Sequence, residues 1–79
     1  MVGYKKIKLN DKSAIYDYYP ENNKTTKGTV LYHRKNGDMQ IIKRSENDLR
    51  SVYAWHLRDR LDEFNETGNF RESGYVAWY

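Results

Sequence analysis

The sequence predicts an α+β domain, in which a mostly antiparallel sheet of four to five strands has one long helix packed on one face. Residues 4–43 contain four short stretches with the alternation or aliphatic content of strands, residues 45–66 have a helical hydrophobic pattern, and residues 75–79 resemble a final strand. The elements therefore follow the order β-β-β-β-α-β. With 79 residues, the chain is expected to form a single small domain with a thin core.

The first two strands are predicted at residues 4–9 and 14–19. Lysines alternate with aliphatic residues in the first strand, a pattern typical of a protected sheet edge. Residues 10–12 are turn formers, and Pro20 ends the second strand because proline cannot donate to a strand ladder. Residues 21–28 are polar and have no periodicity, which indicates a mobile loop.

The turn length of this first hairpin decides which way its tyrosines face, since a shift of one residue moves every side chain to the other face. A four-residue turn puts Tyr16 and Tyr18 in the core. A three-residue turn instead puts Ile15 in the core beside Ile7 and Leu9. We favour the three-residue turn, because it gathers the aliphatic side chains on one side. The outward face would then carry a cationic aromatic set, namely Tyr4, Lys6, Lys8, Tyr16 and Tyr18.

A second hairpin is predicted from the stretches 29–34 and 39–43. The Asn-Gly pair at 36–37 favours a two-residue type I′ turn between them, because both central residues of that turn need a positive φ. Such a turn would place Tyr32 opposite Ile41.

One helix is predicted over residues 45–66. Ser45 and Asp48 resemble a weak capping box at its start, and Gly68 suits the C-terminal cap. On a helical wheel Leu61 falls at the margin of the apolar stripe. The stripe itself, which would cover the sheet, consists of Leu49, Val52, Tyr53, His56, Leu57, Arg60 and Phe64.

The charges are divided unevenly along the chain. Residues 1–44 contain ten Lys and Arg against four Asp and Glu, a net charge of +6, whereas residues 45–79 contain four against seven, a net charge of −3. This asymmetry indicates either that the two halves face each other in the fold or that the basic half meets a polar partner. Tyrosines interleave with the basic residues, which is compatible with stacking of single-stranded nucleic acid.

Several chemistries are not indicated by the sequence. Without cysteine there are no disulfides, thiolate nucleophiles or sulfur-liganded zinc sites. The acidic residues and the two histidines lack the spacing of calcium or zinc motifs, and no phosphate-binding glycine loop occurs. We therefore expect neither metal nor cofactor. The absence of a long apolar run and of a signal-peptide pattern predicts a cytoplasmic protein without membrane association.

The two histidines, His33 and His56, raise the question of enzymatic activity. As an acid and base pair, with arginines as phosphate clamps, they would suit metal-independent RNA cleavage. Each also has a structural explanation, because His33 lies in a predicted strand and His56 borders the helix stripe. We therefore predict no enzymatic activity and keep a small ribonuclease as the last alternative.

The preferred function is a small non-catalytic module that binds a protein partner and regulates or inhibits it by occlusion. A single-stranded nucleic-acid-binding protein that uses the same sheet face is the first alternative, and that face could also form a homodimer. Trp55 and Arg58, on the far side of the helix, are residue types that anchor protein interfaces. The predicted binding residues are Tyr4, Lys6, Lys8, Tyr16, Tyr18, Arg34, Trp55 and Arg58.

Overall fold

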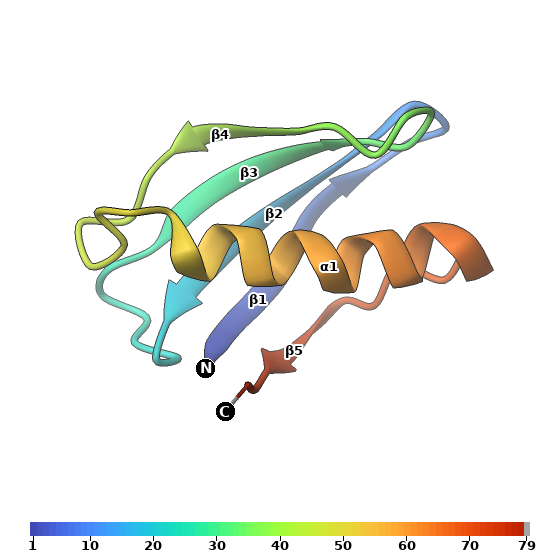
Figure 1. Cartoon of the computed structure of the whole chain (residues 1–79). Helices are drawn as coiled ribbons and strands as arrows, with labels where there is room; N and C mark the ends of the chain where they lie inside the picture. The colour runs from blue at the N-terminus through green and yellow to red at the C-terminus, as the bar shows by residue number, and fades with distance from the viewer. Residues whose placement is uncertain (79) are drawn as a thin grey trace.

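The computed structural model describes residues 1–78 and confirms the predicted fold class and element order. Within these residues five antiparallel strands form one sheet in the order β4-β3-β2-β1-β5, and a single helix runs across one face (Figure 1). The elements are β1 (Val2–Leu9), β2 (Ser13–Pro20), β3 (Gly28–His33), β4 (Met39–Lys43), α1 (Val52–Thr67) and β5 (Ser73–Val76). The last strand was predicted at residues 75–79, but β5 begins two residues earlier and ends at Val76, so Ala77 and Trp78 lie beyond it. Tyr79, the last residue of that prediction, lies outside the described residues.

The β1–β2 hairpin uses both registers that the sequence allowed. From Val2 to Lys6 the pairing is that of the three-residue turn, with Tyr4 opposite Tyr18. A β-bulge between Lys6 and Lys8 then adds one residue to β1, so that the pairing next to the turn is that of the four-residue turn. The bulge therefore allows one hairpin to combine the pairing of the three-residue turn with that of the four-residue turn.

The prediction that Tyr16 and Tyr18 face outward is wrong. Both side chains are 0% exposed and lie on the sheet face that α1 covers, together with Tyr4, whereas Ile7 and Leu9 are exposed. The thin layer between one helix and one sheet is filled best by large rings, because each ring buries more area than an aliphatic side chain. Aromatic contacts confirm this packing, since the Tyr4 ring centroid lies 5.8 Å from that of Tyr16 and 5.8 Å from that of Phe64.

β1 was predicted to be an edge strand, but it lies between β2 and β5. Its first residues, Val2 to Lys5, pair with β5 on one side and with β2 on the other. Among residues 1–78 the edges of the sheet are formed by β4 and β5. The lysines of β1 therefore do not protect a full edge, although residues 7–9 extend beyond the pairing with β5.

The turn between β3 and β4 differs from the predicted type I′ turn. His33 N donates to Asp38 O at 2.7 Å, which closes a longer loop over residues 34–37 in which Gly37, but not Asn36, has a positive φ. Tyr32 consequently pairs with Met39 instead of Ile41. This shift by two residues keeps the predicted faces from Val30 to Tyr32. A further irregularity between Thr29 and Val30 pairs Lys43 with Thr29, although the predicted turn would place it opposite Val30.

The helix begins seven residues later than predicted, at Val52. Ser51 has a φ of 60°, in the left-handed region, so the chain turns before the helix starts and residues 45–50 form turns. Asp48 caps the helix, because its carboxylate oxygens accept hydrogen bonds from Tyr53 N and Ala54 N, both at 3.1 Å. The predicted C-terminal cap is confirmed, since Gly68 has a φ of 76°.

The buried side of α1 is rotated relative to the predicted stripe. Its buried residues are Ala54, Leu57, Leu61 and Phe64. Leu61, which we placed at the margin, is thus in the core, whereas Leu49 and Val52 are 72% and 45% exposed. Over the part of the chain that the structure describes, α1 is neither long nor apolar enough to cross a membrane.

The polar loop between β2 and β3 is held by its own side chains. Asn23 Oδ1 accepts hydrogen bonds from Thr25 N at 3.0 Å and Thr25 Oγ1 at 2.7 Å. Gly28, predicted as the last loop residue, begins β3, where it pairs with Tyr18. The Tyr18 ring occupies the space that a Cβ atom would need, which explains the glycine at this position. The mobility of the loop stays a prediction.

Candidate interaction surfaces

The eight predicted binding residues occupy four different environments. Tyr4, Tyr16 and Tyr18 belong to the core and present no surface. The Tyr16 hydroxyl donates to Arg71 O at 2.6 Å, and the Tyr18 hydroxyl accepts from Ser45 N at 3.0 Å. Burial raises the pKa of both phenols, so they remain neutral hydrogen-bonding groups.

Lys6 and Arg34 are half-buried and hold segments of the fold together. Lys6 Nζ donates to the carbonyl oxygen of Phe70 at 3.3 Å and lies 3.6 Å from a carboxylate oxygen of Glu72. Arg34 Nη1 donates to Asn10 O at 2.7 Å, and its guanidinium carbon lies 4.9 Å from the centre of the Phe70 ring. Both cations thus have structural contacts, which their positions in the sequence did not reveal.

Trp55 and Arg58 are the predicted pair that the structure brings together on the surface. The Arg58 guanidinium lies 5.6 Å from the centre of the Trp55 ring, within the range of a cation–π contact. Arg58 Nε also donates to Gly37 O at 3.0 Å, which ties this side chain to the β3–β4 loop. Trp55 is 47% exposed. The pair therefore presents a partly fixed aromatic and cationic group to solvent.

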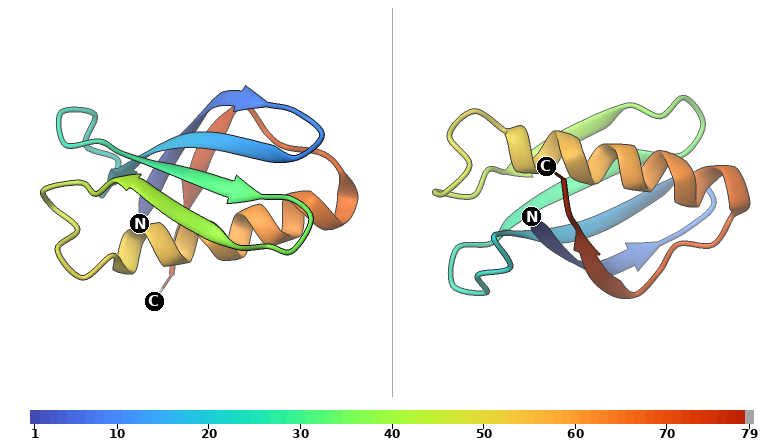
Figure 2. Two further views of the ribbon diagram at one scale, coloured as in Figure 1. Left: turned by 90° about the horizontal axis from the view of Figure 1, so that it is seen from above. Right: turned by 60° about the horizontal axis from the view of Figure 1, so that its bottom comes forward.

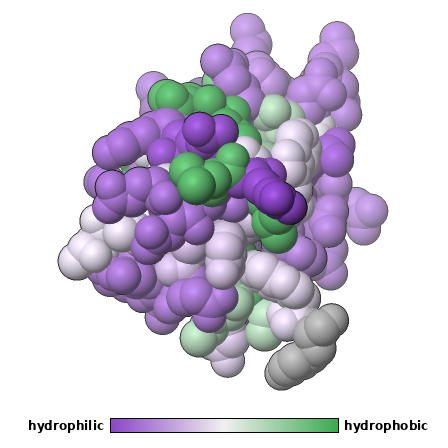
Figure 3. Space-filling view, turned by 60° about the vertical axis from the view of Figure 1, so that its left-hand side comes forward, coloured by the Kyte–Doolittle hydropathy of each residue, from purple (hydrophilic) through white to green (hydrophobic). Residues whose placement is uncertain are grey.

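This pair belongs to a larger surface, which we call the α1 surface, consisting of Leu49, Arg50, Val52, Trp55, Arg58 and Asp59. Two adjoining open hollows include these residues and have Arg50 and Val52 in common, so the surface is continuous. Figure 3 brings forward the left-hand side of Figure 1, and hydrophobic residues (green) are visible there among hydrophilic ones (purple). Sequence reasoning missed Leu49, Arg50 and Val52 because the turn at Ser51 changes their orientation.

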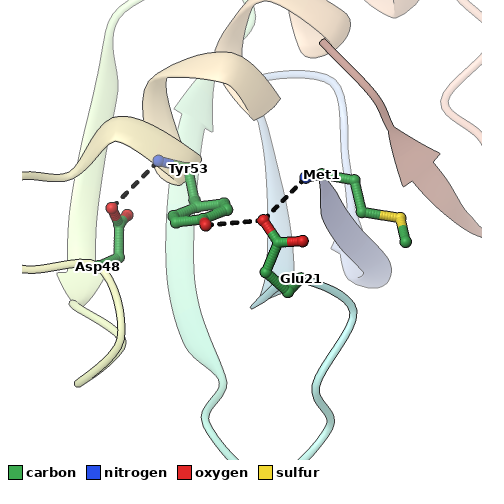
Figure 4. Close-up of polar contacts among 4 residues, drawn as sticks. All are labelled: Met1, Glu21, Asp48 and Tyr53. Atoms are coloured by element: carbon green, nitrogen blue, oxygen red, sulfur yellow. Dashed lines mark hydrogen bonds and ion pairs between the residues drawn. The ribbon is translucent and has the colours of Figure 1, made fainter. Parts of the chain in front are cut away.

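The start of α1 is fixed by a chain of hydrogen bonds (Figure 4). The Tyr53 hydroxyl donates to Glu21 Oε2 at 2.8 Å, and the Met1 amino group lies 3.0 Å from the same oxygen. The hydrogen bond from Tyr53 is the main cause that lowers the pKa of the Glu21 carboxyl, and the hydrogen bond from the amino group is the second. The same hydrogen bond raises the pKa of Tyr53. On the next turn, His56 stacks on Trp78 with ring centres 3.8 Å apart.

No helix covers the sheet face opposite α1 (Figure 2, left). Basic side chains predominate on this face, with Lys5 and Lys43 in the strands and Lys27 beside Asp17. One row of paired residues crosses four strands of this face, and it consists of Lys5, Asp17, Thr29 and Lys43. Asp17 is buried there, accepting from Thr29 Oγ1 at 2.8 Å and lying 3.3 Å from Lys27 Nζ. Lys8, a predicted binding residue, is exposed in the pairing position opposite Ile15.

The aromatic content of this open face is small. Tyr19 is buried, with Lys24 Nζ 4.2 Å from its ring centre. Tyr75, which is 60% exposed, is the only exposed tyrosine among residues 1–78. The tyrosine platform expected for single-stranded nucleic acid therefore lies under the helix instead.

The two histidines line separate hollows. His33 lines a hollow with Lys12, Lys35 and their neighbours, whereas His56 lines the one that contains Trp55. Among residues 1–78, no three His, Asp or Glu side chains are grouped closely enough to hold a metal ion.

Comparison with known proteins identifies no relative. No protein-family model matches the chain, and no curated protein or solved structure shows significant similarity to it. A functional proposal therefore has to come from the surfaces described above.

Proposed function

We propose that this domain is a small non-catalytic module that binds a protein partner through the α1 surface and regulates or inhibits that partner by occlusion. The observation that carries the proposal is the exposure of three neighbouring apolar side chains, Leu49, Val52 and Trp55. Contiguous apolar groups bordered by polar residues are typical of protein interaction sites. The cytoplasm remains the predicted compartment, on sequence grounds alone.

The chemistry of the surface indicates what the partner presents. Arg50 and Arg58 flank the apolar residues, and neither forms an ion pair within residues 1–78. Tryptophan and arginine contribute most of the binding free energy in many interfaces. We therefore infer a partner with an apolar recess bordered by carboxylates, into which Trp55 inserts.

The α1 surface is also largely fixed before binding. Asp48 holds the first turn of the helix, and Tyr53 links that turn to Glu21. A surface that is ordered in advance loses little conformational entropy on association. This favours a role as a rigid binding module over one that folds on binding.

The two alternatives have less support. Single-stranded nucleic acid was expected to stack on Tyr16 and Tyr18, which are buried. A ribonuclease was expected to combine His33 and His56, which line different hollows. A homodimer through the α1 surface would bury the same residues and is treated as an outcome of the test.

The test begins with capture of partners by the wild-type chain and by Trp55→Ala, followed by titration of the identified protein in purified form. We expect a 1:1 complex that Trp55→Ala weakens about 30-fold or more, as for a central interface residue. Arg58→Lys should weaken it less, because it keeps the charge but loses the planar stacking group.

Tyr75→Ala is the matched control, since it removes an exposed aromatic ring from β5, outside the α1 surface. It should bind as the wild type does. The proposal is wrong if the identified partner binds Trp55→Ala with wild-type affinity, if Tyr75→Ala is the more damaging change, or if the chain only binds a second copy of itself.

A further inference from the structure

A basic hollow lies between the β2–β3 loop and the segment after β4. It has a volume of about 380 Å³. No residue of the α1 surface lines it. The residues that line this basic hollow are Lys24, Thr25, Thr26, Lys27, Lys43, Arg44 and Glu46.

The two walls of the basic hollow are joined by hydrogen bonds. Ser45 Oγ donates to Thr26 O, and Asn47 Nδ2 donates to Thr26 Oγ1 at 3.2 Å. Ser45 is itself buried, and its backbone N donates to the Tyr18 hydroxyl in the core. The hollow is thus part of the folded framework and does not depend on a ligand to bring its walls together.

The charges around the basic hollow are not balanced. Lys24, Lys27, Lys43 and Arg44 contribute four cations, whereas Glu46 is the one carboxylate in the lining. Lys27 is paired with Asp17, but the other three cations form no ion pair in the described part of the chain. Cations held on two facing walls repel one another, and an anion between them would relieve the repulsion.

We propose that the basic hollow binds the phosphate groups of a small, multiply charged phosphate compound. An arginine supplies planar, bidentate hydrogen bonds to phosphate oxygens, and lysines add point charges that can approach from several directions. The volume suits a compound between pyrophosphate and a nucleotide in size. No aromatic side chain lines the hollow, so it offers no stacking platform for the bases of a nucleic-acid strand.

This inference is independent of protein binding at the α1 surface. Pyrophosphate is the probe, titrated by calorimetry into the wild-type chain, with a short oligothymidylate as the nucleic-acid comparison. We expect pyrophosphate to bind at one site. Lys43→Gln and Arg44→Gln should each weaken that binding about tenfold or more, because each removes a charge-assisted contact.

Lys35→Gln is the matched control, because it removes one exposed cation outside the basic hollow, and it should bind pyrophosphate as the wild type does. Thermal unfolding of each variant checks that the fold is retained. The proposal is overturned if pyrophosphate does not bind at millimolar concentration, or if Lys35→Gln weakens binding as much as Arg44→Gln. Binding of the oligothymidylate without binding of pyrophosphate would also overturn it. Trp55→Ala should leave pyrophosphate binding unchanged, so the two proposals can fail separately.

Discussion

Each of three buried tyrosines ends in a hydrogen bond at the margin of the core. Tyr16 donates to Arg71 O, Tyr18 accepts from Ser45 N, and Tyr32 donates to Asp62 Oδ1 at 2.5 Å. The rings thereby fill a thin layer while the hydroxyls reach polar partners, which is how tyrosine is tolerated inside a protein. This explains why a domain with so few aliphatic residues can place its tyrosines under the helix.

Tyr32 gives a prediction at alkaline pH. Burial, as the main cause, and the hydrogen bond to Asp62, as the second, raise the pKa of Tyr32 from 10.0 to about 12. The native state therefore holds the Tyr32 proton more tightly than the unfolded chain does. The stability that the protonated hydroxyl contributes is complete below pH 10 and is lost as the pH rises toward 12. Urea unfolding should show that the wild type loses about 1–2 kcal/mol more stability than Tyr32→Phe over this interval. Parallel pH profiles for the two proteins would contradict the assignment.

The individual elements were predictable from the sequence to different degrees. The five strands, the single helix and its end at Gly68 follow from periodicity and cap residues. The bulge in β1 did not, because an inserted residue leaves the alternation of apolar residues ambiguous. The late start of α1 did not either, since Ser51 in a left-handed conformation carries no signal that distinguishes it from an ordinary serine.

The helix start leads to a prediction about Asp48. Its carboxylate accepts two backbone hydrogen bonds at the N-terminus of α1 and is buried. Asp48→Ala should lower the free energy of unfolding by about 1–3 kcal/mol, because two amide groups lose their acceptor. Asp59→Ala is the control, since Asp59 is exposed on the same helix, and it should change stability by less than about 0.5 kcal/mol. Equal losses in urea unfolding would show that Asp48 is not the cap.

For the molecule as a whole, the uneven distribution of charge along the chain corresponds to an uneven distribution over the surface. One interpretation of the sequence was that the basic and acidic halves face each other, yet within residues 1–78 the only ion pair joining them is that between Lys6 and Glu72. Most cations of the first half lie instead on the open sheet face and around the basic hollow. The asymmetry is visible in the sequence, but only the fold shows on which surfaces these cations lie.

Only part of the candidate site was predicted from the sequence, because the sequence does not show which side of a strand is covered. Trp55 was recognised because it lies away from both the predicted and the observed apolar stripe of the helix, whereas Arg58 is half-buried next to that stripe and reaches the surface beside Trp55. The tyrosines were misplaced because the inward face of a half-buried strand is decided by what covers it. A sequence of alternating tyrosines and lysines does not contain that information.

The central claim is that a protein partner binds the α1 surface, and side-chain footprinting of the purified complex tests it most directly. Oxidation by hydroxyl radicals reports the solvent access of individual side chains in the free chain and in the complex. We predict that Leu49 and Trp55 lose their reactivity on binding, while Ile42 and Tyr75 keep theirs, all four being exposed in the free chain. Protection of Ile42 and Tyr75 with Leu49 and Trp55 still reactive would contradict the account.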